Sequence, residues 1–228
     1  MSEFSEILRA VLPDLQEAAY ARFEIYYQRL TEKNAVMNLT AVTEPEAVAK
    51  KHFADSLAAT EYLPEGAKVI DVGTGAGFPG VPLLIVRPDL QITLADSLQK
   101  RLLFLEELLK ELNLTAEIVH GRAEDLGRDV KYREKFDFAL SRAVASLPVL
   151  LELTTPFVRV GGTAIAYKGK AAEEIAAAKS AAFLLHVKLG EKAIPSDIGE
   201  RSLVFAEKTA PTPKLYPRKA GTPGKKPL

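Results

Sequence analysis

The 228-residue chain contains no cysteine, no tryptophan and only three histidines. Without cysteine the protein can form neither disulfides nor metal sites that use thiolate ligands. His52, His120 and His186 are scattered along the chain and match no recognisable metal-ligand pattern. We therefore expect a cytoplasmic protein that holds no structural metal ion.

The sequence also lacks a long apolar run, because no stretch approaches the ~20 residues that a helix needs to cross a bilayer. Residues 1–6 are acidic and polar, unlike the basic and then apolar start of a signal peptide. Hydrophobic residues make up 47% of the chain, which is enough to fill the core of one sizeable domain with extensions. We expect no signal peptide, no membrane partner and a monomer, although the sequence does not itself reveal the oligomeric state.

The whole chain has no net charge, with 30 basic and 30 acidic residues, but its last twenty residues contain no acid. This tail, residues 209–228, has five prolines and five basic residues: Lys214, Arg218, Lys219, Lys225 and Lys226. Such composition is typical of a segment without regular structure, which is either merely solvated or in contact with an anionic partner. We predict a tail that lacks regular structure when free and that meets such a partner.

The most informative stretch is residues 71–80, Asp-Val-Gly-Thr-Gly-Ala-Gly-Phe-Pro-Gly, which follows an apolar run. Gly73, Gly75 and Gly77 can adopt positive φ, and without a Cβ they let main-chain N–H groups approach a ligand closely. Pro79 suits the first turn of a helix, where a missing N–H costs little. The stretch predicts a strand, a ligand-binding turn and a helix, although a purely structural tight turn is the alternative.

The spacing of this motif favours S-adenosylmethionine (SAM) over a dinucleotide. In the pattern G-x-G-x-x-G/A counted from Gly73, the third small residue falls at position 78, which is Phe78. Asp71 would repel a pyrophosphate but could hold the cationic amino group of SAM, which has no phosphate. Asp96 lies 23 residues after Gly73, near the spacing at which an acid reaches a ribose hydroxyl, and both cofactor classes contain ribose.

Strand-like and helix-like runs alternate after residue 66, which predicts a mainly parallel α/β sheet covered on both faces. The predicted organisation is a helical extension over 1–65, a cofactor-binding domain over 66–208 and the tail. Expected strands are 69–71, 92–96, 116–120, 136–141 and 163–167, followed by an antiparallel pair at 187–194 and 201–208. Expected helices are 14–30, one opening at 44–46 with a Thr43–Glu46 capping box, 80–86, 97–112, 147–157 and 171–182.

The glycine motif resembles class I SAM-dependent methyltransferases, and further motifs resemble one bacterial family of this class. That family is the small-subunit (16S) ribosomal RNA guanine-N7 methyltransferase, formerly called glucose-inhibited division protein B. The motifs are Asn38-Leu39-Thr40, His52-Phe53-x-Asp55-Ser56-Leu57, Gly121-Arg122-Ala123-Glu124, Ser141-Arg142-Ala143-Val144-Ala145, Lys168-Gly169 and Tyr216-Pro217-Arg218-Lys219. The resemblance covers most of the chain and implies a Rossmann-like fold with a seven-stranded sheet.

The resemblance also implies roles for individual residues in binding SAM and 16S rRNA in the small ribosomal subunit. The cofactor residues implied by position are Gly73 and Phe78, the ribose-side loop of Asp96, Ser97 and Leu98, the adenine-side pair of Ala123 and Glu124, and Arg142 at the mouth of the site. To these the glycine motif itself adds Asp71 and Gly75. Candidates for contact with RNA are Asn38, His52, Lys168, Arg218 and Lys219.

Some of these residues have a plainer interpretation. Glu124 could be a solvated acid at a helix start, and Lys168 could be a surface lysine whose stem lies along apolar neighbours. His52 and Asp55, three apart on a predicted helix, could order the mouth of the site or simply hydrogen-bond each other. Arg142 follows a predicted strand, and the strand-end rule places it on the ligand side of the sheet.

The implied reaction needs no catalytic base, because guanine N7 carries a lone pair and no proton. We therefore expect no catalytic residue in the strict sense, and we expect Arg142 and Lys168 to orient the substrate. The alternatives are a methyltransferase for a protein or small molecule, a ribosome-binding module that holds SAM without turnover, and a nicotinamide enzyme.

Overall fold

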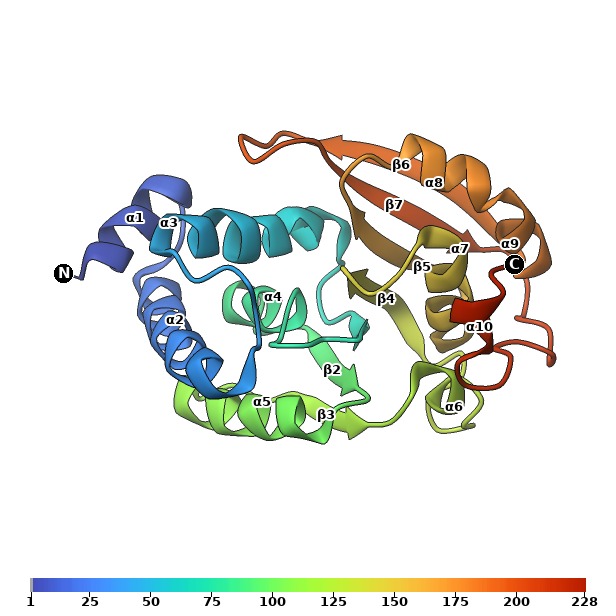
Figure 1. Cartoon of the computed structure of the whole chain (residues 1–228), viewed down its shortest axis with the longest axis horizontal. Helices are drawn as coiled ribbons and strands as arrows, with labels where there is room; N and C mark the ends of the chain where they lie inside the picture. Colours follow the sequence, from blue (N-terminus) through green and yellow to red (C-terminus); the bar gives the residue numbers. More distant parts are fainter. Residues whose placement is uncertain (1) are drawn as a thin grey trace.

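The computed structural model describes residues 2–228 as one seven-stranded sheet with helices on both faces (Figure 1). The strand order is β3-β2-β1-β4-β5-β7-β6, in which only the pairs β5-β7 and β7-β6 are antiparallel. The strands are β1 (Lys68–Val72), β2 (Gln91–Asp96), β3 (Glu117–His120), β4 (Phe136–Arg142), β5 (Val158–Lys168), β6 (Val187–Ile194) and β7 (Arg201–Lys208). The predicted mostly parallel α/β sheet is confirmed, including its closing antiparallel pair.

Two hydrophobic cores lie on the two faces of the sheet, and successive side chains of β1 point alternately into one and the other. Val69 belongs to the first core and Ile70 to the second, as the period of two in a strand requires. The first core is covered by α2 (Glu17–Met37), α4 (Gly80–Val86) and α5 (Gln99–Leu112). The second is covered by α6 (Ala123–Leu126), α7 (Leu147–Thr154), α8 (Ala172–Ala177) and α9 (Lys179–Leu184).

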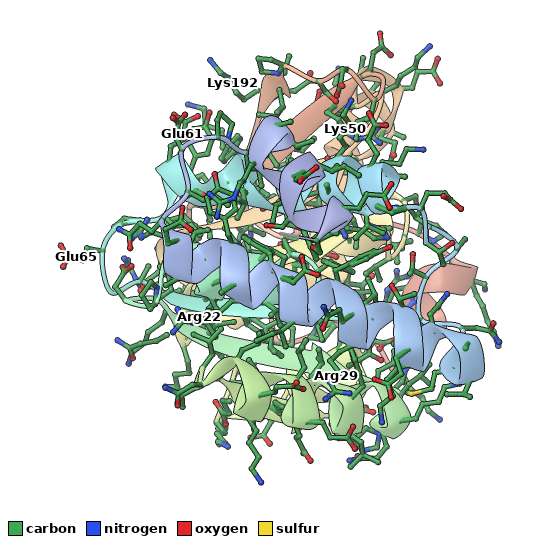
Figure 2. All side chains as sticks on the ribbon, turned by 90° about the vertical axis from the view of Figure 1, so that its left-hand side faces the viewer. Arg22, Arg29, Lys50, Glu61, Glu65 and Lys192 are labelled. Carbon is green, nitrogen blue, oxygen red and sulfur yellow. The ribbon has the colours of Figure 1, made fainter. Side chains whose placement is uncertain are left out.

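The N-terminal extension packs onto the first core instead of standing apart from it. It consists of α1 (Glu3–Val11), α2, α3 (Pro45–Val48), the π-helical turn η1 (Ala49–Ala54) and the 3₁₀ segment η2 (Leu57–Tyr62). Phe23, Tyr26 and Phe53 are fully buried and pack on one another. In Figure 2, α2 runs above α5, and Arg29 of α2 forms an ion pair of 2.6 Å with Glu111 of α5.

The predicted capping box at Thr43 is wrong. The helix begins at Pro45, its N-cap is Glu44, and no side chain caps it. A residue before proline is driven towards extended backbone, and Glu44 accordingly has φ −62° and ψ 134°. Proline at the first helical position therefore fixes the start of this helix without a hydroxyl cap.

Other boundaries differ from the predicted ones where local geometry interrupts a pattern. The helix predicted over 171–182 is divided into α8 and α9 at Ala178, whose backbone has φ −86° and ψ 0°. The helix predicted over 147–157 ends at Thr154, and a 3₁₀ turn follows with Pro156 in it. α2 starts later and extends further than the predicted span 14–30.

The tail, residues 209–228, has little regular structure beyond the short helix α10 (Thr222–Lys225), as predicted, but it is packed on α6 and α7 (Figure 1). Tyr216 is buried, with 7% of its surface exposed. Arg133 donates hydrogen bonds to the carbonyls of Thr212 and Tyr216 at 2.8 and 2.9 Å. Composition correctly indicated little regular structure, but side chains of the body satisfy the backbone groups that helices and strands would otherwise pair.

Both edges of the sheet are short or charged. At one edge β3 has only four residues, and at the other edge β6 exposes Lys188, Glu191 and Lys192.

Within residues 2–228 no helix has both the length and the apolar character needed to cross a membrane.

Candidate active site

Two adjoining cavities lie where the parallel strands end at their carboxyl edge. The first, the glycine-loop cavity, measures about 290 Å³ and is lined by Gly73, Asp96 and Glu124 among others. The second, the arginine cavity, measures about 420 Å³ and is lined by Arg142 and Lys168 among others. Ala143 lines both, so a single residue after β4 separates them. A larger cavity of about 680 Å³ beside α1 contains no residue of the glycine loop.

Asp71 fixes the conformation of the glycine loop through hydrogen bonds. Its Oδ2 accepts hydrogen bonds from the Thr74 hydroxyl at 2.7 Å and from the Gly80 N–H at 2.9 Å. The carboxyl is fully buried, and burial raises its pKa to about 6 in spite of these hydrogen bonds. Asp71 lines neither cavity. The structure therefore gives it a role in ordering the loop that the sequence did not suggest.

The loop approaches its neighbours so closely that two of its glycines admit no side chain. A Cβ on Gly73 would lie 2.7 Å from a methyl of Val144, and a Cβ on Gly77 would lie 2.7 Å from the Tyr26 hydroxyl. Both glycines also have positive φ, at 73° and 104°. Tyr26 in turn donates a hydrogen bond of 2.6 Å to the Ala76 carbonyl, so α2 supports the loop from the extension.

Asp96, at the end of β2, joins the loop to the next turn. Its Oδ2 accepts from the Gly75 N–H and its Oδ1 from the Leu98 N–H, both at 2.9 Å, and Arg101 lies 3.4 Å away. Ser97 lines the glycine-loop cavity, whereas the Leu98 side chain is 43% exposed and does not. The carboxylate is thus fixed by main-chain donors at the cavity wall, with acceptor capacity to spare.

Glu124 closes the opposite wall of the same cavity, beside Ala123. Its Oε1 accepts from the Gly221 N–H at 2.8 Å and from Arg122 at 3.2 Å. Burial favours the neutral acid, but the hydrogen bonds from Gly221 and Arg122 outweigh it and lower the pKa of Glu124. With only 4% of its surface exposed, Glu124 is not a solvated helix-start acid.

Arg142 connects β4 to η1 through its guanidinium group. It donates to the Lys51 carbonyl at 3.0 Å and to Asp55 Oδ2 at 3.0 Å, and it lies 4.8 Å from the centre of the Phe78 ring. Arg201 binds the other oxygen of Asp55 at 3.2 Å. Arg142 lies at the carboxyl end of β4 and lines the arginine cavity, and Asp55 pairs with two arginines instead of with His52.

His52 is a neutral stacking residue in this arrangement. Its ring stacks on Phe78 at 4.6 Å, and its Nε2 lies 2.7 Å from the Thr40 hydroxyl. Burial, with the nearby Arg142 charge, lowers the pKa of His52 to about 4. Tyr26 stacks on Phe78 at 5.3 Å, so Phe78 is enclosed and lines neither cavity.

The low pKa of His52 makes stability depend on pH. The unfolded state binds the proton more tightly, so this contribution is fully present above pH 6.5 and is lost as pH falls towards 4. We expect the stability advantage of the wild type over His52→Gln to fall by about 3 kcal/mol between pH 7 and pH 4. Urea unfolding of both proteins across this range measures the difference between their free energies of unfolding. Asp71 titrates in both proteins, so its effect cancels in this difference. A pH-independent difference would contradict the buried, neutral imidazole.

The remaining predicted residues lie at different places. Lys168 lines the arginine cavity and donates to Glu174 at 2.7 Å and to the Ala145 carbonyl at 2.8 Å, so it is not a free surface lysine. Arg218 is paired with the buried Glu152, whereas Lys219 is exposed. Asn38 ends α2 with φ 50° and lines neither cavity.

Arg201 and Arg101 are charged cavity residues that the sequence did not single out. Arg101 lies in α5, shortly after Asp96, and Arg201 comes from a distant part of the chain. It opens β7, which pairs with β5 so that Lys168 lies opposite Ser202. The predicted antiparallel pair 187–194 and 201–208 could have indicated this position, because an antiparallel strand that starts at residue 201 begins at the edge where the parallel strands end. The described residues, 2–228, contain no cluster of three or more His, Asp or Glu side chains that could hold a metal ion.

Comparison with known proteins identifies the family. The family model of rRNA small subunit methyltransferase G (GidB) matches residues 19–204. The chain belongs to this family. A curated relative of that name from Desulfitobacterium hafniense (strain Y51) is 50% identical over 212 residues, covering 91% of this chain and 88% of that protein. Another of the same name from Lachnoclostridium phytofermentans (strain ATCC 700394 / DSM 18823 / ISDg) is 47% identical, covering 100% of this chain and 97% of that protein.

A solved structure supports the fold. A SAM-dependent methyltransferase from Aquifex aeolicus superposes with a TM-score of 0.56 at 17% identity, covering 74% of this chain and 96% of that one. The Rossmann-like class I fold expected from the resemblance is confirmed. Membership of rRNA small subunit methyltransferase G makes this protein a SAM-dependent methyltransferase and not a nicotinamide enzyme.

The glycine-loop cavity fits this cofactor. It presents two carboxylates, Asp96 and Glu124, on facing elements, and such groups accept hydrogen bonds from hydroxyl and amino groups. Gly73 and Val144 both line this cavity, and they pack so closely that a Cβ on Gly73 would lie 2.7 Å from a Val144 methyl. Arg101 and Arg122 also line this cavity, but each is paired with one of these carboxylates: Arg101 lies 3.4 Å from Asp96, and Arg122 lies 3.2 Å from Glu124.

Proposed function

We propose that this protein transfers a methyl group from SAM to N7 of one guanine in the 16S rRNA of the small ribosomal subunit. The observation that carries the proposal is the pair of adjoining cavities that share Ala143 at the carboxyl edge of the sheet. In the first, the carboxylates Asp96 and Glu124 are each paired with an arginine, whereas the second has four cationic side chains and a single carboxylate, Asp55. The first suits the cofactor and the second suits an anionic nucleotide. The names of the curated relatives point to the same substrate.

In the glycine-loop cavity, Asp96 would hold the ribose hydroxyls and Glu124 with Ala123 the adenine edge. Gly73 and Gly75 would bring the main chain against the cofactor, and the bound SAM would supply an electrophilic methyl group on a positively charged sulfur. Asp71, Phe78 and Leu98 would act through the shape of the loops, because none of their side chains lines this cavity.

The chain's own residues need only orient the guanine, because N7 carries a lone pair and no proton. Half-buried His52, whose pKa is lowered to about 4, would be a weak proton acceptor, in keeping with a reaction that needs no general base. Arg142, fixed by Asp55 and two η1 carbonyls, would set the wall against which the base is placed. Correct alignment of two reacting groups can contribute roughly 7–11 kcal/mol to lowering a barrier.

The RNA would bind along the arginine cavity, where Lys51, Lys168 and Arg201 supply positive charge. Guanine N7 in an A-form helix lies in a deep, narrow groove, so the target would be an unstacked base in a loop or junction. Of the other RNA candidates, the exposed Lys219 is free to meet phosphate, whereas Arg218 is held by Glu152 and His52 by its stacking. Asn38 would contact RNA only outside the cavity. The protein would act as a cytoplasmic monomer.

The test is transfer of labelled methyl from SAM to small subunits, and to naked 16S rRNA, from cells that lack this protein. Nuclease digestion and mass spectrometry would identify the modified nucleoside. Label in 7-methylguanosine at one position is the expected result. SAM binding without label in rRNA would favour a methyltransferase for a protein or small molecule, or a non-catalytic module on the ribosome.

A further inference from the structure

The C-terminal strap, defined here as residues 209–221, is bound to the body by side chains from α6 and the following turn. Arg128 donates to the Pro217 carbonyl at 2.7 Å, and Arg133 donates to those of Thr212 and Tyr216 at 2.8 and 2.9 Å. These bonds give an irregular segment one fixed path across the molecule.

A buried ion pair between Glu152 and Arg218, called the latch below, holds the strap. Glu152 of α7 has a fully buried side chain, and its Oε1 accepts from the Arg218 N–H at 2.7 Å. The Arg218 guanidinium also binds Glu152, through Nε to Oε1 at 2.9 Å and through NH2 to Oε2 at 2.6 Å. A buried carboxylate without such donors would be strongly destabilising, so the latch fixes where the chain goes next.

The strap ends at the wall of the glycine-loop cavity. Gly221, with φ 79°, donates its N–H to Glu124 Oε1 at 2.8 Å, and Arg122 binds the same oxygen at 3.2 Å. Oε2 therefore remains as the oxygen available to a ligand in the cavity. Glu124 belongs to a four-residue helix, which alone does little to fix a side chain.

We propose that Gly221 is a positioning residue of the cofactor site, and that the latched strap aims Glu124 at the 6-amino group of adenine. The proposal rests on the proposed function, in which Glu124 meets the adenine of SAM. The tail is then part of the binding site as well as a basic segment. Removing the Gly221 N–H would let the carboxylate turn away while the latch itself stays intact.

The experiment compares Gly221→Pro with Gly221→Ala in the full chain. Both replacements disfavour the positive φ, but only proline removes the N–H. The probes are S-adenosylhomocysteine and its hypoxanthine counterpart, which has a carbonyl in place of the 6-amino group. Calorimetry gives the affinity of each, and the ratio reports the contact with Glu124, because general loosening of the site would weaken both ligands alike.

We expect the wild type and Gly221→Ala to prefer the adenine compound by about 10- to 100-fold, the value of a hydrogen bond to a charged group. Gly221→Pro should lose most of this preference, as should Glu124→Gln. A truncation after Ala220, compared with one after Lys226, provides a second test that should give the same pair of results.

The outcomes separate the two proposals. If Glu124→Gln keeps the adenine preference, Glu124 does not read adenine and its assignment in the proposed function fails. If Glu124→Gln loses the preference but Gly221→Pro and the truncation after Ala220 both keep it, the strap does not position Glu124 and the present inference is overturned.

Discussion

Replacing Asp96 by alanine is expected to weaken SAM binding by about 100-fold. A hydrogen bond to a charged group contributes roughly 1.5–3 kcal/mol, and a carboxylate at this wall can accept from both ribose hydroxyls. The change also removes the acceptor that ties the Gly75 N–H to β2, so the glycine loop loses one of its anchors. Isothermal titration of SAM into the folded variant measures the effect.

Asp125→Ala is the matched control, because it removes an exposed carboxylate next to Glu124 with the same change in net charge. Its SAM affinity should equal that of the wild type. An Asp96 variant that binds SAM as tightly as the wild type would remove the assignment of the glycine-loop cavity to the cofactor.

Arg142→Ala should lower the rate of methyl transfer by about 100-fold or more while changing SAM affinity much less. The guanidinium joins β4 to two carbonyls of η1 and to Asp55, and it lies over Phe78. Without it, the wall between the two cavities loses its link to the extension, and a misplacement of ~1 Å can cost on the order of 100-fold in rate. Single-turnover transfer with saturating SAM separates this effect from binding.

Arg142→Lys should recover only part of the rate, because lysine lacks the planar fork that reaches several acceptors at once. Arg159→Ala is the matched control: it removes an exposed arginine from the opposite end of the sheet and should leave transfer unchanged. Equal single-turnover rates for Arg142→Ala and the wild type would show that Arg142 orients neither the loop nor the substrate.

Hydrophobic periodicity and the glycine motif predicted the sheet and the first cavity, because both depend on short-range sequence features. The strand ends at Asp96 and Arg142 follow from alternation of strands and helices, and the strand-end rule then places them at one edge. Gly73, Ser97, Ala123 and Glu124 join Asp96 there, as the family resemblance implies. These residues lie at or shortly after the ends of β1, β2 and β3, where the strand-end rule places a ligand.

What the sequence could not show are partners brought together across long separations. Glu152 and Arg218 are 66 positions apart, and neither residue type signals that the other will be buried beside it. Proline and lysine content indicated a free tail, but composition says nothing of Arg128 and Arg133, which bind its carbonyls. Deleting residues 209–228 would therefore do more than remove basic side chains, because it would leave the buried Glu152 without its donors.

The form of the sheet edges bears on how the protein behaves at high concentration. An open strand edge can template pairing with another chain, and short or charged edges oppose such pairing. Here β3 is too short to offer a long ladder, and Lys188 and Lys192 of β6 would be brought against like charges on an approaching copy. A high concentration of the enzyme should therefore not cause aggregation through strand pairing.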